Sequence, residues 1–141
     1  MITSINKLII TALLLLFLSL PALAENFRPG IYSSLEYHEE SGDLLGAEIY
    51  VIPAGTGYWV VFQESQGEPA APILVSAEIA EDAITFDLPD KGSGYAGRFT
   101  GKFLEDGRLE GRFEESGIAP DGSELFSLRY GPGYWQRQPR N

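Results

Sequence analysis

The chain has 141 residues, 20 acidic against 10 basic side chains, a formal net charge of −10 and no cysteine. A length of this order fits one domain, and that domain must be stable without disulfide bonds. The excess of negative charge argues against binding nucleic acid or anionic membrane surfaces, because both require basic protein surfaces. It favours a basic partner, or serves solubility alone.

Residues 1–24 have the features of a cleaved secretory signal peptide. Lys7 gives a positive amino-terminal region, residues 8–20 are apolar but too short to span a bilayer as a helix, and Ala22 to Ala24 fit the small-x-small cleavage pattern. The alternative is a membrane anchor. We expect cleavage and a mature domain of residues 25–141, with 9 basic and 20 acidic residues and a charge of −11, because Lys7 is the one charged residue removed. After cleavage of the signal peptide, we expect the protein to be exported to the periplasm or the medium, with no membrane span remaining. The lack of cysteines and of glycosylation sequons suits a bacterial source.

Most of the mature chain alternates apolar and polar residues with period two, which indicates strands with one buried face. Polar or glycine- and proline-rich segments separate these runs. The predicted strands are residues 30–37, 45–52, 58–64, 73–80 and 83–88, the two arms of a hairpin over 95–115, and 123–130.

The alternation also predicts which side chains face the core. Residues 58–64 are apolar on both faces, so their inward side stays open. The residues expected to face inward elsewhere are Ile31, Ser33, Leu35, Tyr37, Leu45, Ala47, Ile49, Val51, Ile73, Val75, Ala77, Ile79, Ile84, Phe86, Leu88, Phe99, Phe103, Leu109 and Phe113.

The hairpin over 95–115 has a register that its turn can set. A two-residue loop at Asp106 and Gly107 would mix apolar and charged faces, whereas a three-residue loop ending in a left-handed Gly107 keeps the faces aligned. The three-residue loop pairs Phe103 with Leu109, Phe99 with Phe113, Lys102 with Glu110 and Arg98 with Glu114. The glycines at 97 and 101 stand between aromatic residues, where they let the sheet curve or let neighbouring rings cover them.

A two-residue turn at Glu81 and Asp82 likewise pairs Ile79 with Ile84 and Ala77 with Phe86. Eight short strands joined in succession predict an all-β, single-domain, antiparallel up-and-down meander that closes into a complete or flattened barrel. A two-sheet sandwich is the alternative.

No catalytic residue, metal site or cofactor is predicted. Residues 92–97 match G-x-G-x-x-G, but a strand follows them where dinucleotide binding requires a helix. His38, the single histidine, lies in an acidic turn without recognisable metal-ligand spacing. Four acidic pairs, at 39–40, 81–82, 105–106 and 114–115, could supply an acid/base couple, but they lie at turns or strand ends where charge is expected anyway. The pattern favours a binding protein over an enzyme.

Two pairs of neighbouring aromatics, Tyr58 with Trp59 and Tyr134 with Trp135, would place rings on opposite faces of an extended chain. The outward rings could stack on a sugar or a partner, and the alternative is that they fill the core or plug the barrel end.

The strand number and order resemble the calycin group, the lipocalin-like and avidin-like barrels. Lipocalins carry Gly-x-Trp on the first strand and an arginine on the last strand that packs over the tryptophan. Gly30-Ile31-Tyr32 and Arg129 are similar, with tyrosine in place of tryptophan. The resemblance implies a small apolar ligand in the barrel mouth; alternatively, the inner phenylalanines fill the barrel. The residues assigned to this ligand are Tyr32, Trp59, Phe99, Phe103, Phe113 and Arg129.

A second resemblance is to bacterial periplasmic lysozyme inhibitors, small exported barrels whose Ser-Gly-rich loop enters the enzyme cleft. Gly92-Ser93-Gly94-Tyr95 is similar to that loop. The resemblance implies a basic protein partner, such as a lysozyme, contacted by Ser93, Gly94 and Tyr95.

Overall fold

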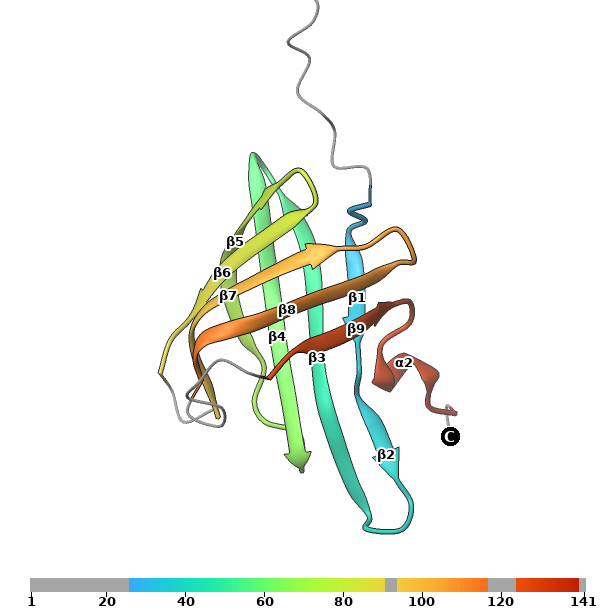
Figure 1. Cartoon of the computed structure of the whole chain (residues 1–141). Helices are drawn as coiled ribbons and strands as arrows, with labels where there is room; N and C mark the ends of the chain where they lie inside the picture. The colour runs from blue at the N-terminus through green and yellow to red at the C-terminus, as the bar shows by residue number, and fades with distance from the viewer. Residues whose placement is uncertain (1–25, 91–93, 117–123, 140–141) are drawn as a thin grey trace, which may run out of the picture.

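A computed structural model describes residues 26–90, 94–116 and 124–139. The chain forms an all-β, antiparallel barrel, as the alternating pattern predicts (Figure 1). Its elements are β1 (Gly30–Ser33), β2 (Glu36–His38), β3 (Asp43–Ala54), β4 (Gly57–Gly67), β5 (Ile73–Ala80), β6 (Ala83–Leu88), β7 (Tyr95–Phe103), β8 (Arg108–Ser116), β9 (Phe126–Tyr130) and α2 (Tyr134–Arg137). The predicted signal peptide, Ser93 and most of the loop before β9 lie outside the described residues.

The barrel closes because β1 pairs with strands from both ends of the meander. Strands β3 to β9 each pair with their neighbour in sequence, and β1 bonds β9 on one side and β3 on the other. Eight strands therefore form the ring, and β2 is an additional strand that extends the β3 edge beyond it. The closed barrel, rather than the two-sheet sandwich, is the fold.

The expectation of one continuous strand over residues 30–37 is wrong. The chain breaks after Ser33, where the Ser34 amide donates to the Ala47 carbonyl oxygen at 2.8 Å and the Leu35 amide turns to the Ser33 hydroxyl at 3.2 Å. Leu35 is buried as predicted. Tyr32, which has the opposite parity, is also buried, and Tyr37, expected inside, is exposed. Ile31, also expected inside, is half-buried and lies on the outer face.

A second difference from the predicted inward face lies at the start of β3. Ala47, Ile49 and Val51 face inward as predicted, but Leu45 is exposed and Leu44 is buried instead. The alternation changes phase at Gly46, whose φ of 113° is unfavourable for residues with a side chain. A Cβ at this position would also overlap the Ser34 carbonyl group, so glycine is what allows the two strands to approach here.

The remaining inward residues are placed as the pattern predicts. Those of β6, β7 and β8 are buried, and Ile73, Val75 and Ile79 pack against the core from β5. The sequence left open which side of β4 faces the core, and in the structure Val60 and Phe62 are the buried side.

Aromatic rings fill the centre of the barrel. Phe86 stacks on Phe99 with ring centroids 4.8 Å apart, and Phe99 contacts Phe113 at 5.1 Å. Phe62, which comes from β4 in a different part of the wall, reaches Phe113 at 5.5 Å. Rings from separate strands therefore meet each other across the interior.

Both predicted turns hold. Gly107 has a φ of 82°, and the β7–β8 register pairs Phe103 with Leu109 and Phe99 with Phe113. The pairing of Arg98 with Glu114 is wrong, because a bulge between Ala96 and Phe99 shifts the register there. Arg98 instead lies opposite Asp87 of β6 and forms a 3.1 Å ion pair with it.

The second turn pairs Ile79 with Ile84 and Ala77 with Phe86. After β9, the extended conformation expected for Tyr134 and Trp135 is wrong: both stand on the single helical turn α2, with their rings edge to face at 5.0 Å. In the described part of the chain, no helix has the length and apolar character needed to cross a membrane.

Candidate functional site

The barrel wall has an opening beside β9. Strands β1 and β9 pair through Tyr32 with Tyr130 and Ser33 with Arg129, and the ladder stops there. After Ser33 the chain leaves β9 and bends toward β3. The earlier part of β9, from Phe126 to Leu128, pairs only with β8 among the described strands. Figure 1 shows β2 and β9 diverging from this point. Residues Phe126 to Leu128 therefore have a ladder partner on one side among the described strands.

Two pockets, each about half open to solvent, adjoin at this opening, and we call them together the seam cleft. The outer chamber has a volume of about 640 Å³ and the inner chamber about 490 Å³. Ser34 and Ser127 line both chambers, so the chambers meet between the end of β1 and the start of β9. A molecule bound here could contact both.

The outer chamber is polar and carries two arginines. Arg129 projects from β9 and Arg137 from α2, with Glu36 of β2 as the acidic side chain of the lining. One nitrogen of Arg137, Nη2, donates to the Leu35 carbonyl oxygen at 2.8 Å. Neither arginine forms an ion pair with any residue that the structure describes.

Helix α2 forms the rim of the outer chamber because two side chains of the barrel hold it. The Tyr134 amide donates to Glu48 at 2.8 Å, and the Trp135 indole N–H donates to Gln63 at 3.2 Å. Glu48 and Gln63 are paired residues on the outer face of β3 and β4. These bonds place Arg137 over the bend at Leu35.

The inner chamber is more apolar. Leu45, Tyr95, Leu125 and Phe126 supply its apolar surface, and Ser65, Gln66 and Glu124 add polar groups. The pKa of the Tyr95 hydroxyl is raised, first by burial and then by its hydrogen bond to Glu124 and the nearby negative charge of Glu64. The hydroxyl therefore stays protonated at neutral pH.

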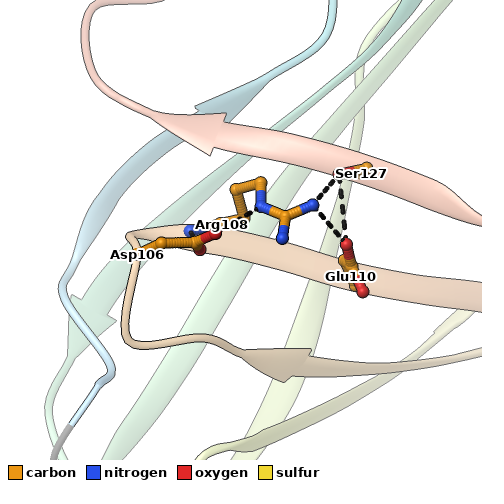
Figure 2. A network of polar contacts seen from close by, with 4 residues as sticks. All are labelled: Asp106, Arg108, Glu110 and Ser127. Atoms are coloured by element: carbon orange, nitrogen blue, oxygen red, sulfur yellow. Dashed lines mark hydrogen bonds and ion pairs between the residues drawn. The ribbon is translucent and has the colours of Figure 1, made fainter.

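Ser127, which lies between the chambers, is held by a charged network (Figure 2). Arg108 donates to Glu110 at 2.6 Å, to Asp106 at 2.7 Å and to the Ser127 hydroxyl at 3.2 Å. The hydrogen bond from Arg108 lowers the pKa of Asp106. Both carboxylates thus neutralise Arg108, and its guanidinium serves to orient the serine.

A buried carboxylate lies at the same end of the barrel. Glu64 is 5% exposed and accepts a hydrogen bond from the Gly94 amide at 2.9 Å, with Gln66 donating at 3.4 Å. A buried carboxylate needs such donors, because its desolvation is costly when it is unpaired. Glu64 therefore fixes the backbone where β7 begins.

Of the six residues assigned to a ligand by the resemblance, Phe99 contacts Phe113 and Phe103 contacts Tyr32, whereas Trp59 and Arg129 lie outside this core. Phe99, Phe103 and Phe113 are buried among other core rings, and Trp59 is on the outer face, 43% exposed. Tyr32 is buried too, and its hydroxyl donates to the Arg28 carbonyl oxygen at 2.8 Å.

Of the six, Arg129 lines the outer chamber, and the other five line neither chamber of the seam cleft. The ring that packs on Tyr32 from the last strand is that of Tyr130, with centroids 5.3 Å apart. Of the three residues expected in a partner loop, Ser93 lies outside the described residues, Gly94 is bonded to Glu64, and the Tyr95 ring is buried beside the inner chamber.

The residues that sequence reasoning missed are Ser34, Leu45, Ser127 and Arg137. A period-two pattern gives no signal for them, since the cleft exists where the first strand stops pairing with the last.

The outer face of the barrel carries a row of apolar side chains across four strands. Ile31, Tyr50, Val61 and Leu74 lie opposite one another in the register of β1, β3, β4 and β5. Trp59 lies on the same face of β4, two residues from Val61. This surface is separate from the seam cleft.

Among the described residues no three His, Cys, Asp or Glu side chains are grouped so that they could hold a metal ion. Comparison with protein-family models, with curated proteins and with solved structures found no match for this chain.

Proposed function

We propose that this is an exported, non-enzymatic binding protein that holds a small amphipathic molecule in the seam cleft. The supporting observation is that a polar chamber and a more apolar chamber meet between Ser34 and Ser127. Small-molecule sites are typically concave and apolar with a few placed polar groups. The ligand lies at the wall in this proposal, because core rings occupy the barrel centre.

The closed eight-stranded meander supports the wider proposal that the chain is a calycin-like barrel. Lipocalin-like proteins use the open end of such a barrel for apolar ligands, and fold alone does not assign function. The cleft, rather than the architecture, therefore carries the functional argument.

A blocking substitution tests the proposal. Ser127→Trp places an indole between the two chambers, and an exposed strand position tolerates an aromatic residue. We expect an uncharged environment-sensitive dye, N-phenyl-1-naphthylamine, to bind the native protein with enhanced fluorescence and to lose at least about tenfold in affinity, roughly 1.4 kcal/mol, in the variant.

The matched control is Ser76→Trp, an exposed strand serine that lines neither chamber of the seam cleft. It should bind the dye as the native protein does. Equal binding by both tryptophan variants would contradict the cleft as the site.

The second proposal is that the protein binds a basic protein such as a lysozyme. The formal charge of −10 and the apolar row from Ile31 to Leu74 support it, because exposed apolar patches mark protein interfaces. Lysozyme activity should then fall in excess native protein and recover with Leu74→Lys. Undiminished activity at all ratios would reject the lysozyme version.

A further inference from the structure

We propose that the ligand of the seam cleft carries a singly charged oxyanion head group, such as a carboxylate, which Arg129 and Arg137 bind in the outer chamber. This inference rests on the proposed function and names the chemical class of its ligand. The apolar chain of the ligand would pass between Ser34 and Ser127 into the inner chamber.

The first argument is the charge of the outer chamber. Its lining holds two guanidinium groups and the carboxylate of Glu36, a formal sum of +1, in a chain whose formal net charge is −10. The chamber thus has the opposite sign to the rest of the molecule. A cavity concentrates such a local field, whereas the distant negative charges are screened beyond about 10 Å at 0.1 M salt.

The second argument is that neither of these two arginines has an ion-pair partner in the described part of the chain. The ion pairs found among the described residues involve Arg98, with Asp87, and Arg108, with Asp106 and Glu110. Arg108 lies directly opposite Arg129 in the β8–β9 register, yet both acidic neighbours turn to Arg108. Arg129 therefore keeps its charge available to a ligand.

The third argument is geometric. The bond from Arg137 Nη2 to the Leu35 carbonyl oxygen holds that guanidinium at the edge of the chamber and leaves its other N–H donors available. Arg129 is fixed at its backbone by strand pairing with Ser33 and Arg108. Guanidinium groups bind carboxylates through paired, parallel hydrogen bonds, so an arginine placed in advance recognises an oxyanion specifically.

The fourth argument is that the head group of the ligand carries one negative charge rather than two. Glu36 shares the lining with the two arginines, so a dianionic phosphate monoester would leave the chamber negative. A monoanion balances the formal charge. A cationic or uncharged head group would leave at least one arginine without a partner.

The test compares four amphiphiles that each carry a ten-carbon chain in displacement of N-phenyl-1-naphthylamine at pH 7.5, where a carboxylate is ionised. We expect decanoate to bind at least about tenfold more tightly than decanol, a difference of about 1.4 kcal/mol. Decyl phosphate should bind more weakly than decanoate, and decyltrimethylammonium should bind most weakly.

Arg129→Gln should reduce the affinity for decanoate about tenfold, or about 1.4 kcal/mol, and leave that for decanol unchanged. Arg98→Gln removes the same charge from an exposed strand outside the cleft, so it should change neither affinity. Arg129→Lys keeps the charge but not the paired donors, so it should restore part of the decanoate affinity. Thermal unfolding of each variant confirms that it is folded.

The outcomes separate the two proposals. Equal binding of decanol and decanoate, or equal loss in the Arg98 and Arg129 variants, would overturn the head-group proposal and leave the cleft intact. Tighter binding of decyl phosphate than of decanoate would overturn the single charge. Failure of the dye and of all four amphiphiles to bind would overturn the proposed function itself.

Discussion

Gly111 is a position where the backbone leaves no space for a side chain. A Cβ on this residue would lie 2.7 Å from the Thr100 carbonyl oxygen and 2.8 Å from the Gly101 Cα, and it would also meet the Phe99 ring. Gly101 is its partner across β7 and β8, and the Phe99 ring lies against both glycines. The ring therefore covers the glycines, which was one of the two roles that the sequence allowed for Gly101.

We predict that Gly111→Ala lowers the free energy of unfolding by about 3 kcal/mol, because the strand backbones must separate to admit the methyl group. Gly57→Ala is the matched control, since no atom lies within 4 Å of its Cβ position and its φ is not positive. Its stability should stay within about 1 kcal/mol of the native value in urea unfolding. Similar losses in both variants would show that the close approach at Gly111 is absent.

At the scale of elements, β9 has two unlike edges. The Tyr130 amide donates to Gly107 of the β7–β8 turn, whereas the Gly131 amide donates to Ile31 of β1, both at 3.0 Å. In an antiparallel strand alternate residues bond to opposite sides, so Ser127 directs its amide toward β1. The β1 ladder has already ended there, at Ser33.

We predict that the Ser127 amide exchanges its hydrogen with solvent at least about tenfold faster than the Tyr130 amide, because it has no ladder partner among the described strands. Hydrogen exchange followed by NMR measures both amides in one sample. A ligand that fills the seam cleft should slow exchange at Ser127. Equal protection of the two amides in the free protein would mean that the wall is closed.

The elements that sequence reasoning placed correctly are those whose register depends on local turns. The hairpins around Glu81 and Gly107 carry their own turn chemistry, so their pairings follow from adjacent residues. The break between β1 and β2 was not predictable in this way. It depends on the approach of Ser34 to Gly46, which another strand supplies.

At the scale of the whole molecule, two buried tyrosines make the free energy of unfolding depend on pH in the alkaline range. Burial raises the pKa of both Tyr32 and Tyr95, and the hydrogen bond to Glu124 raises that of Tyr95 further. A raised pKa means that the folded state holds its proton more tightly than the unfolded state. The contribution to stability is complete below the unfolded pKa of about 10 and is lost as pH rises through the folded value.

We predict that the free energy of unfolding falls above about pH 10, by up to about 1.4 kcal/mol per pH unit for each such tyrosine. Tyr95→Phe should show a shallower fall, because one of the two groups is removed. Tyr37→Phe, at an exposed position, should follow the native profile. Denaturant unfolding between pH 8 and 12 measures all three, and superposable native and Tyr95→Phe profiles would contradict the linkage.

The candidate site was less accessible to sequence reasoning than the fold. Arg129 was identified through a resemblance, but its partners in the seam cleft come from three separate parts of the chain: the end of β1, the start of β9 and helix α2. The three phenylalanines assigned to a ligand, Phe99, Phe103 and Phe113, have the same inward pattern whether they line a cavity or pack on other rings. Their mutual contacts decided for packing.

The sequence by itself determined the all-β class, the inward face of most strands and the register of both tight hairpins next to their turns, because alternation and turn chemistry act between neighbouring residues. Only the tertiary structure decided that the interior is occupied by rings, that β1 closes the barrel through two residue pairs, and that a cleft lies beside β9. Those features depend on which distant strands meet and where their pairing stops. A local pattern of apolar and polar residues does not encode where that happens.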